Sequence, residues 1–296
     1  MRPAYTTAHC ELELPEYHPF PKYKYHGVAE ALRDVLEVRP APPIPWDTLA
    51  LAHEAAYLQK LRREGLCRAE AHKVGLPWSQ SLLARALHAA GGTLAAALDA
   101  MEGGLGLNLA GGTHHAFPDH AEGYSLFNDV AVAVAYLRAQ GFRGRVLVVD
   151  LDAHQGNGTA AFFRDDPSVF TLSVHAERNY PLKKEPGDLD VGLADAIGDV
   201  DYLAALAPAL EMAFAWRPEL VFYNAGVDVL AGDRFGRLRL SLEGLAARDR
   251  EVFSWVRKAQ APLVVVMGGG YNRDRHLTVA AHAQTYRLAL EALGRR

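Results

Sequence analysis

Short runs of apolar, often β-branched residues alternate along this chain with longer segments in which apolar residues recur at helical spacing. This alternation is typical of β–α–β units, which place the strands of one sheet parallel to each other. Because each run is apolar almost throughout, we expect helices to cover both faces of that sheet. The runs that we interpret as strands are LGLNLA (105–110), RVLVVDL (145–151), SVFTLSV (168–174), ELVFYNA (219–225) and PLVVVMG (262–268).

The helical segments are defined by apolar residues that return every three or four positions. They cover residues 27–37, 49–64, 81–101, 127–140, 200–215, 241–258 and 277–293. Gly141 suits the C-terminal end of one helix, and Ser241 suits the N-cap of another. We find no repeat and no long linker, so we expect the whole chain, 1–296, to form a single domain.

Composition excludes several classes of protein. Lys and Arg total 31 against 35 Asp and Glu in 296 residues, a net charge of −4, which argues against a nucleic-acid partner. Cys10 and Cys67 cannot form a disulfide framework and fit a reducing compartment. We see no apolar signal-peptide core and no stretch near the roughly 20 apolar residues of a membrane span. We therefore expect a cytoplasmic protein with no membrane partner, and its oligomeric state stays open.

Polar residues follow four of the predicted strands at the point where each run ends. In an open parallel sheet, ligands bind beyond the carboxyl ends of the strands, so these residues are candidates for a site. They are His114 and His115 after the first run, Asp150, Asp152, His154 and Asn157 after the second, Asp228 after the fourth and Tyr271 after the fifth. Their convergence on one rim of the sheet is the main functional signal in the sequence.

Three of these residues form a metal-ligand pattern. Asp152 and His154 are two residues apart, so their side chains share one face of an extended chain, and Asp228 can add a second carboxylate. Such a set leaves positions open for water and substrate, as in a catalytic metal site. Oxygen and nitrogen donors without thiolate suit Zn²⁺, while Fe²⁺, Mn²⁺ and Co²⁺ stay open.

The remaining candidates suit proton transfer and charge stabilisation. His114 and His115 are adjacent, so one can hold a proton while the other accepts one. Tyr271 ends the sequence GGGY, where its hydroxyl can donate to a developing oxyanion. A lone histidine or tyrosine is more often a core or surface residue, and it is the neighbouring metal-ligand pattern that favours a role here.

Other motifs give little support to other enzyme classes. GNGTAA (156–161) approximates the dinucleotide-binding turn G-x-G-x-x-A. However, Asp152 and His154 intervene between the strand and this turn, where phosphates would meet a carboxylate. The sequence contains no G-x-S-x-G elbow, Walker loop or H-E-x-x-H, which argues against serine hydrolases, P-loop proteins and zincins.

AGGTHHA, DLDAHQGNGT, YNAGVDVLAGDRFGRLRLS and GGGY, in this order and spacing, resemble the zinc-dependent histone deacetylase family of the arginase–deacetylase superfamily. The likeness runs from about residue 18 to the C-terminus and is greatest to the class IV subgroup. It implies a single α/β domain with an open, mainly parallel eight-stranded sheet flanked by helices. It also implies that water activated by Zn²⁺ removes an acyl group, acetyl or longer, from N-acyl-lysine in a protein or peptide or from a related acylated small amine.

The resemblance also implies a role for each matching residue. Asp152, His154 and Asp228 would be the zinc ligands. His114 and His115 would handle protons, Asp150 would orient His114, Asn157 would face His115, and Tyr271 would stabilise the transition state. Gly123, Tyr124 and Tyr180 would line the acyl-lysine tunnel, and Asp150 and Ser173 would contribute to a structural K⁺ site.

The sequence departs from the family pattern at three positions. Asn157 stands where class I members carry an aspartate, Gln155 replaces a histidine, and Thr113 replaces a bulkier aromatic residue. Because an amide stabilises an imidazolium less than a carboxylate does, we expect the pKa of His115 to be lower than in a class I site.

Two alternative functions stay open. One is a ureohydrolase-like binuclear manganese enzyme, although Gly156 occupies the position where that chemistry needs a bridging carboxylate. The other is a catalytically silent module that binds acyl groups or metal. The sequence leaves the acyl-chain length, the physiological substrate and the metal in vivo undetermined.

Overall fold

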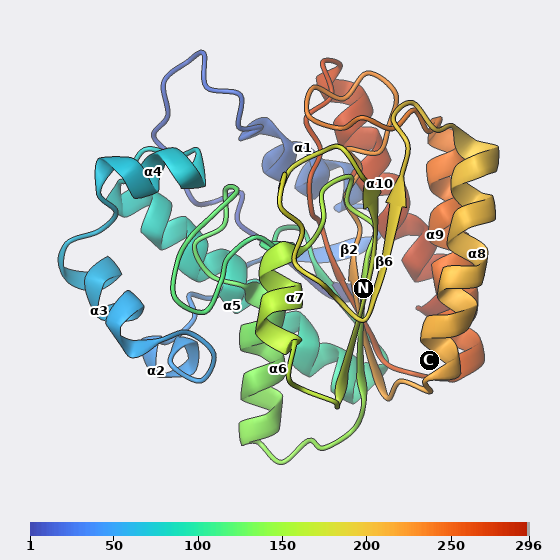
Figure 1. The fold of residues 1–296 in the computed structure, drawn as a ribbon, viewed down its shortest axis with the longest axis horizontal. Helices are drawn as coiled ribbons and strands as arrows, with labels where there is room; N and C mark the ends of the chain where they lie inside the picture. The colour runs from blue at the N-terminus through green and yellow to red at the C-terminus, as the bar shows by residue number, and fades with distance from the viewer. Residues whose placement is uncertain (295–296) are drawn as a thin grey trace.

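Eight strands form one sheet at the centre of the protein (Figure 1). The structure is a computed structural model that describes residues 1–294. Every neighbouring pair of these strands is parallel, in the order β2-β1-β3-β8-β7-β4-β5-β6. The strands are β1 (Arg2–Thr6), β2 (Leu36–Pro40), β3 (Leu105–Asn108), β4 (Val146–Asp150), β5 (Val169–Ala176), β6 (Leu189–Leu193), β7 (Leu220–Asn224) and β8 (Leu263–Val266). The expected α/β class with an eight-stranded parallel sheet is confirmed.

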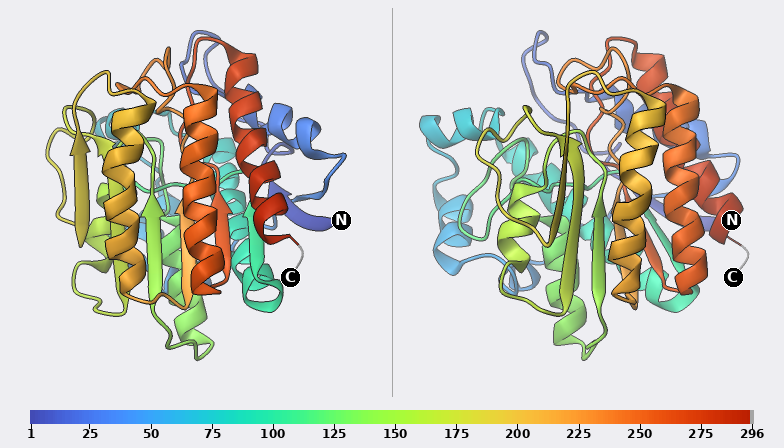
Figure 2. Two further views of the ribbon diagram at one scale, coloured as in Figure 1. Left: turned by 90° about the vertical axis from the view of Figure 1, so that its right-hand side faces the viewer. Right: turned by 45° about the vertical axis from the view of Figure 1, so that its right-hand side comes forward.

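Helices cover both faces of this sheet. One face carries α1 (Tyr23–Leu32), α8 (Asp199–Ala215), α9 (Leu242–Ala259) and α10 (Arg275–Leu293), of which the last three stand side by side in the left view of Figure 2. The other face carries α5 (Gln80–Gly103), α6 (Asp129–Ala139) and α7 (Asn157–Phe163). The short helices α2 (Trp46–Leu49), α3 (Ala55–Arg63) and α4 (Arg68–Val74) pack outside α5 (Figure 1).

The strands are apolar throughout because their alternate residues enter two different cores. In β4, Leu147 and Val149 pack in the cluster under α8 to α10, whereas Val146 and Val148 pack in the cluster under α5 to α7. All four side chains are buried. Two covered faces therefore explain why the sequence shows runs rather than alternation.

The order of the strands brings the predicted site together. Strands β3, β8, β7 and β4 are neighbours, and their last residues pair with one another in register: Asn108 with Val266, Val266 with Asn224, and Asn224 with Asp150. The loops that leave these strands therefore start side by side on one edge of the sheet.

The predicted strands and the five predicted helices from residue 81 onward are all present, with ends that differ by a few residues. The Ser241 hydroxyl accepts from Gly244 N as an N-cap, and Gly141 follows the end of α6 with a positive φ of 96°. The predictions nearer the N-terminus were partly wrong. The segment 27–37 contains the end of α1 and the start of strand β2, and 49–64 is split by a turn between α2 and α3.

Helix α5 corrects one further expectation. It is long and apolar enough, by length and composition alone, to cross a membrane, contrary to our expectation that no segment would be. However, 56% of its most apolar window is buried inside the protein, where it packs against β3 and α6. That burial is what the core helix of a folded domain shows.

Candidate active site

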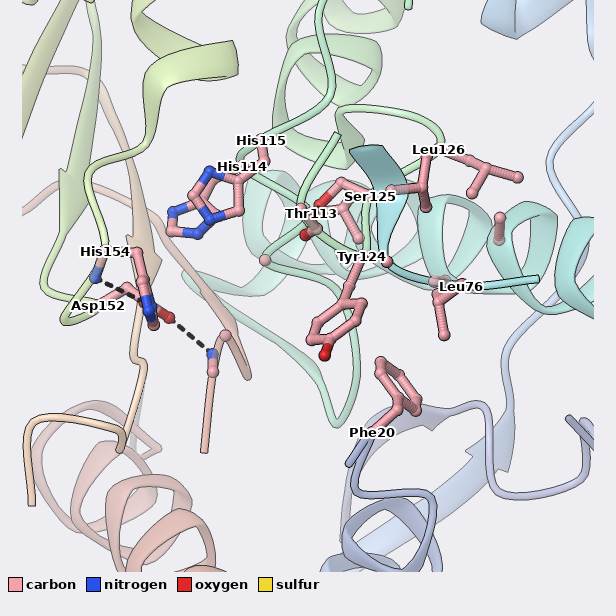
Figure 3. A pocket seen from close by; sticks show the side chains of 18 of the residues that line it. Phe20, Leu76, Thr113, His114, His115, Tyr124, Ser125, Leu126, Asp152 and His154 are labelled. Carbon is pink, nitrogen blue, oxygen red and sulfur yellow. Dashed lines mark hydrogen bonds and ion pairs between the residues drawn. The ribbon is translucent and has the colours of Figure 1, made fainter. Parts of the chain in front are cut away.

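The three predicted metal ligands meet at the carboxyl ends of β4 and β7. Nδ1 of His154 lies 3.0 Å from Oδ1 of Asp152 and 3.0 Å from Oδ2 of Asp228. One ligand atom from each residue lies within 4.8 Å of the others, and all three residues are buried. Figure 3 shows Asp152 and His154 beside the two adjacent histidines.

These residues fit a divalent cation in both spacing and charge. Metal–ligand bonds of about 2.0–2.2 Å at tetrahedral angles separate neighbouring nitrogen and oxygen donors by about 3.4 Å, and the 3.0 Å found here lies close to that separation. Burial and the charge of Asp152 raise the pKa of Asp228 to about 7. Burial alone would lower the pKa of His154, but the two carboxylates raise it to about 10. Two buried carboxylates share one imidazole here, so the site carries more negative than positive charge. A bound cation would neutralise that excess.

Backbone groups hold both carboxylates in place. Gly269 N donates to Oδ2 of Asp152 at 2.7 Å, and Ala153 N donates to Oδ1 of Asp228 at 2.8 Å. A Cβ atom at Gly269 would lie only 2.2 Å from Oδ2 of Asp228, and one at Gly226 only 2.3 Å from Oδ2 of Asp152. The loops can approach the carboxylates this closely only because these positions are glycine.

A buried ion pair on α9 supports the same loops from behind. Nη1 of Arg248 donates to the carbonyl oxygens of Leu151 and Gly226, the residues next to the metal-ligand loops, at 3.1 and 2.6 Å. Arg248 and Asp249 are both fully buried and form a salt bridge of 2.8 Å. The sequence analysis missed this pair, because charged residues inside a helix pattern give no sign of burial.

His114 is held by carboxylate and amide groups. Its Nδ1 lies 2.7 Å from Oδ2 of Asp150, while Nδ2 of Asn224 donates to the other Asp150 oxygen at 3.0 Å. Burial alone would lower the pKa of His114, but the charges of Asp150 and Asp152 raise it to about 9. A pKa of about 9 favours the charged form of His114 near neutral pH. Asn224 was not predicted, although its place at a strand end beside Asp150 was the available signal.

His115 lies against His114, with ring centroids 4.0 Å apart, but in a different environment. Its Nδ1 lies 2.6 Å from Oδ1 of Asn157. Burial lowers the pKa of His115 well below its ordinary value, and the charges of His114 and His154 lower it further. Burial and like charge cause this shift, whereas the Asn157 hydrogen bond acts in the opposite direction. The comparison with class I sites stays a prediction.

Glu122 is a site residue that the sequence analysis missed. Its carboxylate accepts from the Tyr180 hydroxyl and, at 3.4 Å, from Nδ2 of Asn157. Because the Asn157 amide nitrogen points to Glu122, its oxygen points to Nδ1 of His115, which then carries the proton. Glu122 lies in a loop without periodicity, so no sequence pattern marked it.

A cavity of about 340 Å³ connects the metal ligands with an aromatic and aliphatic wall. Tyr271 lines this cavity, and burial and the charges of Asp152 and Asp228 raise the pKa of its hydroxyl well above 10. Figure 3 shows Asp152 and His154 at one end of the cavity, Leu76 and Leu126 toward the other, and Tyr124 between them.

The three predicted tunnel residues, Gly123, Tyr124 and Tyr180, line this cavity. Gly123 has φ of +49°, and a Cβ there would lie 2.4 Å from Cδ2 of His115, so this glycine packs directly on the histidine ring. The next residue, Tyr124, packs 6.0 Å from the ring of Tyr271. The Tyr180 ring meets the His115 ring edge to face, with ring centroids 4.9 Å apart.

Three further positions have structural explanations. Asp150 and Ser173 are partners in the register of β4 and β5, and the K⁺ site expected there stays a prediction. The Gln155 amide nitrogen donates to the Glu185 carbonyl oxygen at 2.7 Å and to Asp190 Oδ1 at 2.8 Å. The Thr113 hydroxyl donates to Asp129 at 2.7 Å, which anchors the loop before the histidine pair.

Gly156 bears on the binuclear alternative. A Cβ atom at Gly156 would lie 2.4 Å from Oδ2 of Asp150, so this position has no room for the bridging carboxylate that a second metal needs. Among the described residues, the only other ligand cluster is His9, Cys10 and His88, and none of these three lines the cavity.

Comparisons with known proteins agree with this geometry. The histone deacetylase domain family matches residues 18–287. An uncharacterized protein of Picosynechococcus is 42% identical over 93% of this chain and 94% of its own length. Histone deacetylase 2 of Arabidopsis thaliana is 37% identical over 64% of this chain, which spans about half of that protein. The crystal structure of a histone deacetylase homolog in complex with SAHA superposes with a TM-score of 0.81 at 25% identity, covering 100% of this chain and 84% of that one. The chain therefore belongs to the histone deacetylase family.

Proposed function

We propose that this protein is a metal-dependent amidohydrolase that removes an acyl group from N-acyl-lysine or a related acylated amine. Membership of the histone deacetylase family supports a deacetylase-type hydrolase. The observation that carries the proposal is the meeting of Asp152, His154 and Asp228 within 4.8 Å, beside a histidine pair in one cavity.

Asp152, His154 and Asp228 would hold the metal, and two carboxylates with one imidazole suit Zn²⁺, with Fe²⁺ as the alternative. When bound, such an ion polarises an acyl oxygen and acidifies water at this end of the cavity. Among the described residues, no third carboxylate joins this cluster, so we favour one metal over a manganese pair.

The two histidines would divide proton transfer between them. His115 is neutral at neutral pH because its pKa is low, and its Nδ1 proton is committed to Asn157. Its Nε2 is then free to take a proton from water and return it to the leaving amine. His114 keeps its charge beside Asp150 and stabilises the negative charge that develops on the substrate.

Tyr271 would donate a hydrogen bond to the oxyanion of the tetrahedral intermediate. Its raised pKa keeps the phenol protonated throughout the working pH range. Interactions of this kind contribute roughly 3–4 kcal/mol to lowering the barrier. The presence of all these groups argues against a catalytically silent binding module.

The cavity favours an aliphatic amide as substrate. Tyr124, Tyr271 and Phe235 pack around it with ring centroids 5.1–6.0 Å apart, which suits the methylene chain of an acylated lysine or polyamine. Its volume of about 340 Å³ lies at the lower end of the range for small-molecule sites, about 300–1,000 Å³. The apolar side chains of Leu76 and Leu126 line it at the end away from Asp152 and His154, so acyl groups longer than acetyl are included in the proposal.

The test is a substrate panel with a metal-stripped control. Acetyl-, butyryl- and longer acyl-lysine peptides and acetylated polyamines are incubated with stripped protein and with protein reloaded with Zn²⁺, Fe²⁺ or Mn²⁺. We expect amine release by the reloaded protein alone. Asp228→Asn should lose both metal and activity, whereas the control Asp195→Asn, at an exposed position, should keep both. Hydrolysis by stripped protein, or none on the whole panel after reloading, would refute the proposal.

A further inference from the structure

A second group of potential metal ligands lies outside the active-site cavity. His9 and Cys10 follow strand β1, and His88 lies on α5. One ligand atom of each lies within 4.8 Å of the other two. The proposed reaction uses none of these three residues.

The spacing of the three side chains matches a tetrahedral metal site. Sγ of Cys10 lies 3.4 Å from Nε2 of His9, and that nitrogen lies 3.4 Å from Nδ1 of His88. Bonds of about 2.3 Å to sulfur and 2.0–2.1 Å to nitrogen, at tetrahedral angles, separate sulfur from nitrogen by about 3.6 Å and two nitrogens by about 3.3 Å. The two imidazole rings meet edge to face at 4.7 Å.

Hydrogen bonds hold this group in place without a metal. Cys10 N donates to Thr7 O at 2.9 Å, which closes the turn, and Nη1 of Arg85 on α5 donates to Thr7 Oγ1 at 2.8 Å. Nδ1 of His88 lies 2.6 Å from the carbonyl oxygen of Ala41. Nδ1 is the ring nitrogen of His88 that faces His9, so it would exchange this hydrogen bond for the ion when a metal binds.

The donor types distinguish this group from the catalytic centre. One thiol and two imidazoles suit a thiophilic cation, whereas the catalytic cluster offers two carboxylates and one imidazole. Cys10 and His88 are half-buried and His9 is exposed, so an ion can enter from solvent. We propose that His9, Cys10 and His88 bind a second divalent cation of the Zn²⁺ type, which links the turn after β1 to helix α5.

This link would stabilise one wall of the active-site cavity. The segment that follows the turn carries Phe20 and Tyr25, which line the cavity. Arg85 precedes His88 by one helical turn, and its guanidinium carbon lies 3.8 Å from the Tyr25 ring centroid. A cation that binds only the folded chain raises the melting temperature with its concentration.

Cobalt absorption can test this site separately from the catalytic one, because only a thiolate ligand gives a sulfur-to-cobalt charge-transfer band. Stripped full-length protein is titrated with Co²⁺, together with Cys10→Ser, His88→Gln and Cys67→Ser, which removes the other, exposed cysteine. We expect the band in wild type and Cys67→Ser, its loss in Cys10→Ser and at least tenfold weaker binding in His88→Gln. Zn²⁺ should abolish the band and raise the melting temperature.

Asp228→Asn separates this proposal from the proposed function, since that variant should lose activity yet keep the charge-transfer band. Melting curves of stripped variants show whether each one folds like the stripped wild type, and His88→Gln provides a second test if Cys10→Ser does not. No band in wild type, a band that persists in Cys10→Ser, or a band that forms only at millimolar Co²⁺ would overturn the proposal.

Discussion

Replacement of Asn157 by Asp should raise the pKa of His115 and move the acidic limb of the pH–rate profile upward. In the structure, His114 bonds to a carboxylate at 2.7 Å and His115 to an amide at 2.6 Å. The pKa of His114 is raised to about 9 and that of His115 is lowered well below 6.5. Asn157→Asp gives the second histidine the same kind of partner as the first.

The size of the shift follows from the distances. An opposite charge in direct contact moves a pKa by roughly 1–3 units, or about 1.4–4 kcal/mol. The new carboxylate would also lie near Glu122, whose Oε1 is 3.4 Å from the Asn157 amide nitrogen. Repulsion between the two carboxylates raises the pKa of the new one, so Asn157→Asp alone should give the lower end of this range. Adding Glu122→Gln supplies a donor again and should give the upper end.

The assay is kcat/KM against pH for metal-loaded wild type, both variants and Glu122→Gln alone. That single variant adds no negative charge, so its acidic limb should not move upward. Metal content and melting temperature are measured for each protein, to exclude a change in loading or folding. If the limb stays in place in Asn157→Asp and in the double variant, while both bind metal normally, His115 is not the base that sets it.

Three further outcomes follow from the described contacts. Tyr271→Phe should bind metal as wild type does and lose roughly 10²–10³ in kcat, measured by steady-state kinetics and metal analysis; unchanged kcat would remove its role. Burial lowers the pKa of His53 to about 4. The unfolded chain therefore binds a proton before the folded chain does as pH falls from about 6.5 to 4, and about 3 kcal/mol of the free energy of unfolding should be lost. Denaturant unfolding should show this loss in wild type and little of it in His53→Gln. Gly269→Ala should lose metal affinity because its Cβ would lie 2.2 Å from Asp228, whereas Gly198→Ala, with its nearest atom at 3.9 Å, should bind normally.

The central strands could be predicted because burial on two faces gives each one a continuous apolar run. The metal-ligand pattern could be predicted because its residues directly follow those runs. Strands β1, β2 and β6 could not. The strands β2 and β6 lie at the two edges of the sheet, and several of their residues are exposed, so they lack continuous apolar runs. Their strand conformation depends on pairing with β1 and β5, which are distant in sequence or separated by a loop.

The supporting residues of the site were hidden for a different reason. Asn224 ended an apolar run, Glu122 lay in a loop, and Arg248 looked like an ordinary helical charge. Each acquires its role only through a tertiary contact. Asn224 contacts Asp150, Glu122 contacts Asn157, and Arg248 contacts the Gly226 carbonyl oxygen. The groups that would touch the substrate follow motifs, whereas those that hold them in place do not.

Glycine next to the carboxylates limits how this centre can change. A Cβ atom added at Gly156, Gly226 or Gly269 would lie 2.2–2.4 Å from an aspartate oxygen. No single substitution at these positions can introduce another donor without displacing an existing one. Evolution or engineering toward a two-ion catalyst would therefore have to rebuild whole loops, and a change of preferred ion must come from the donors already present.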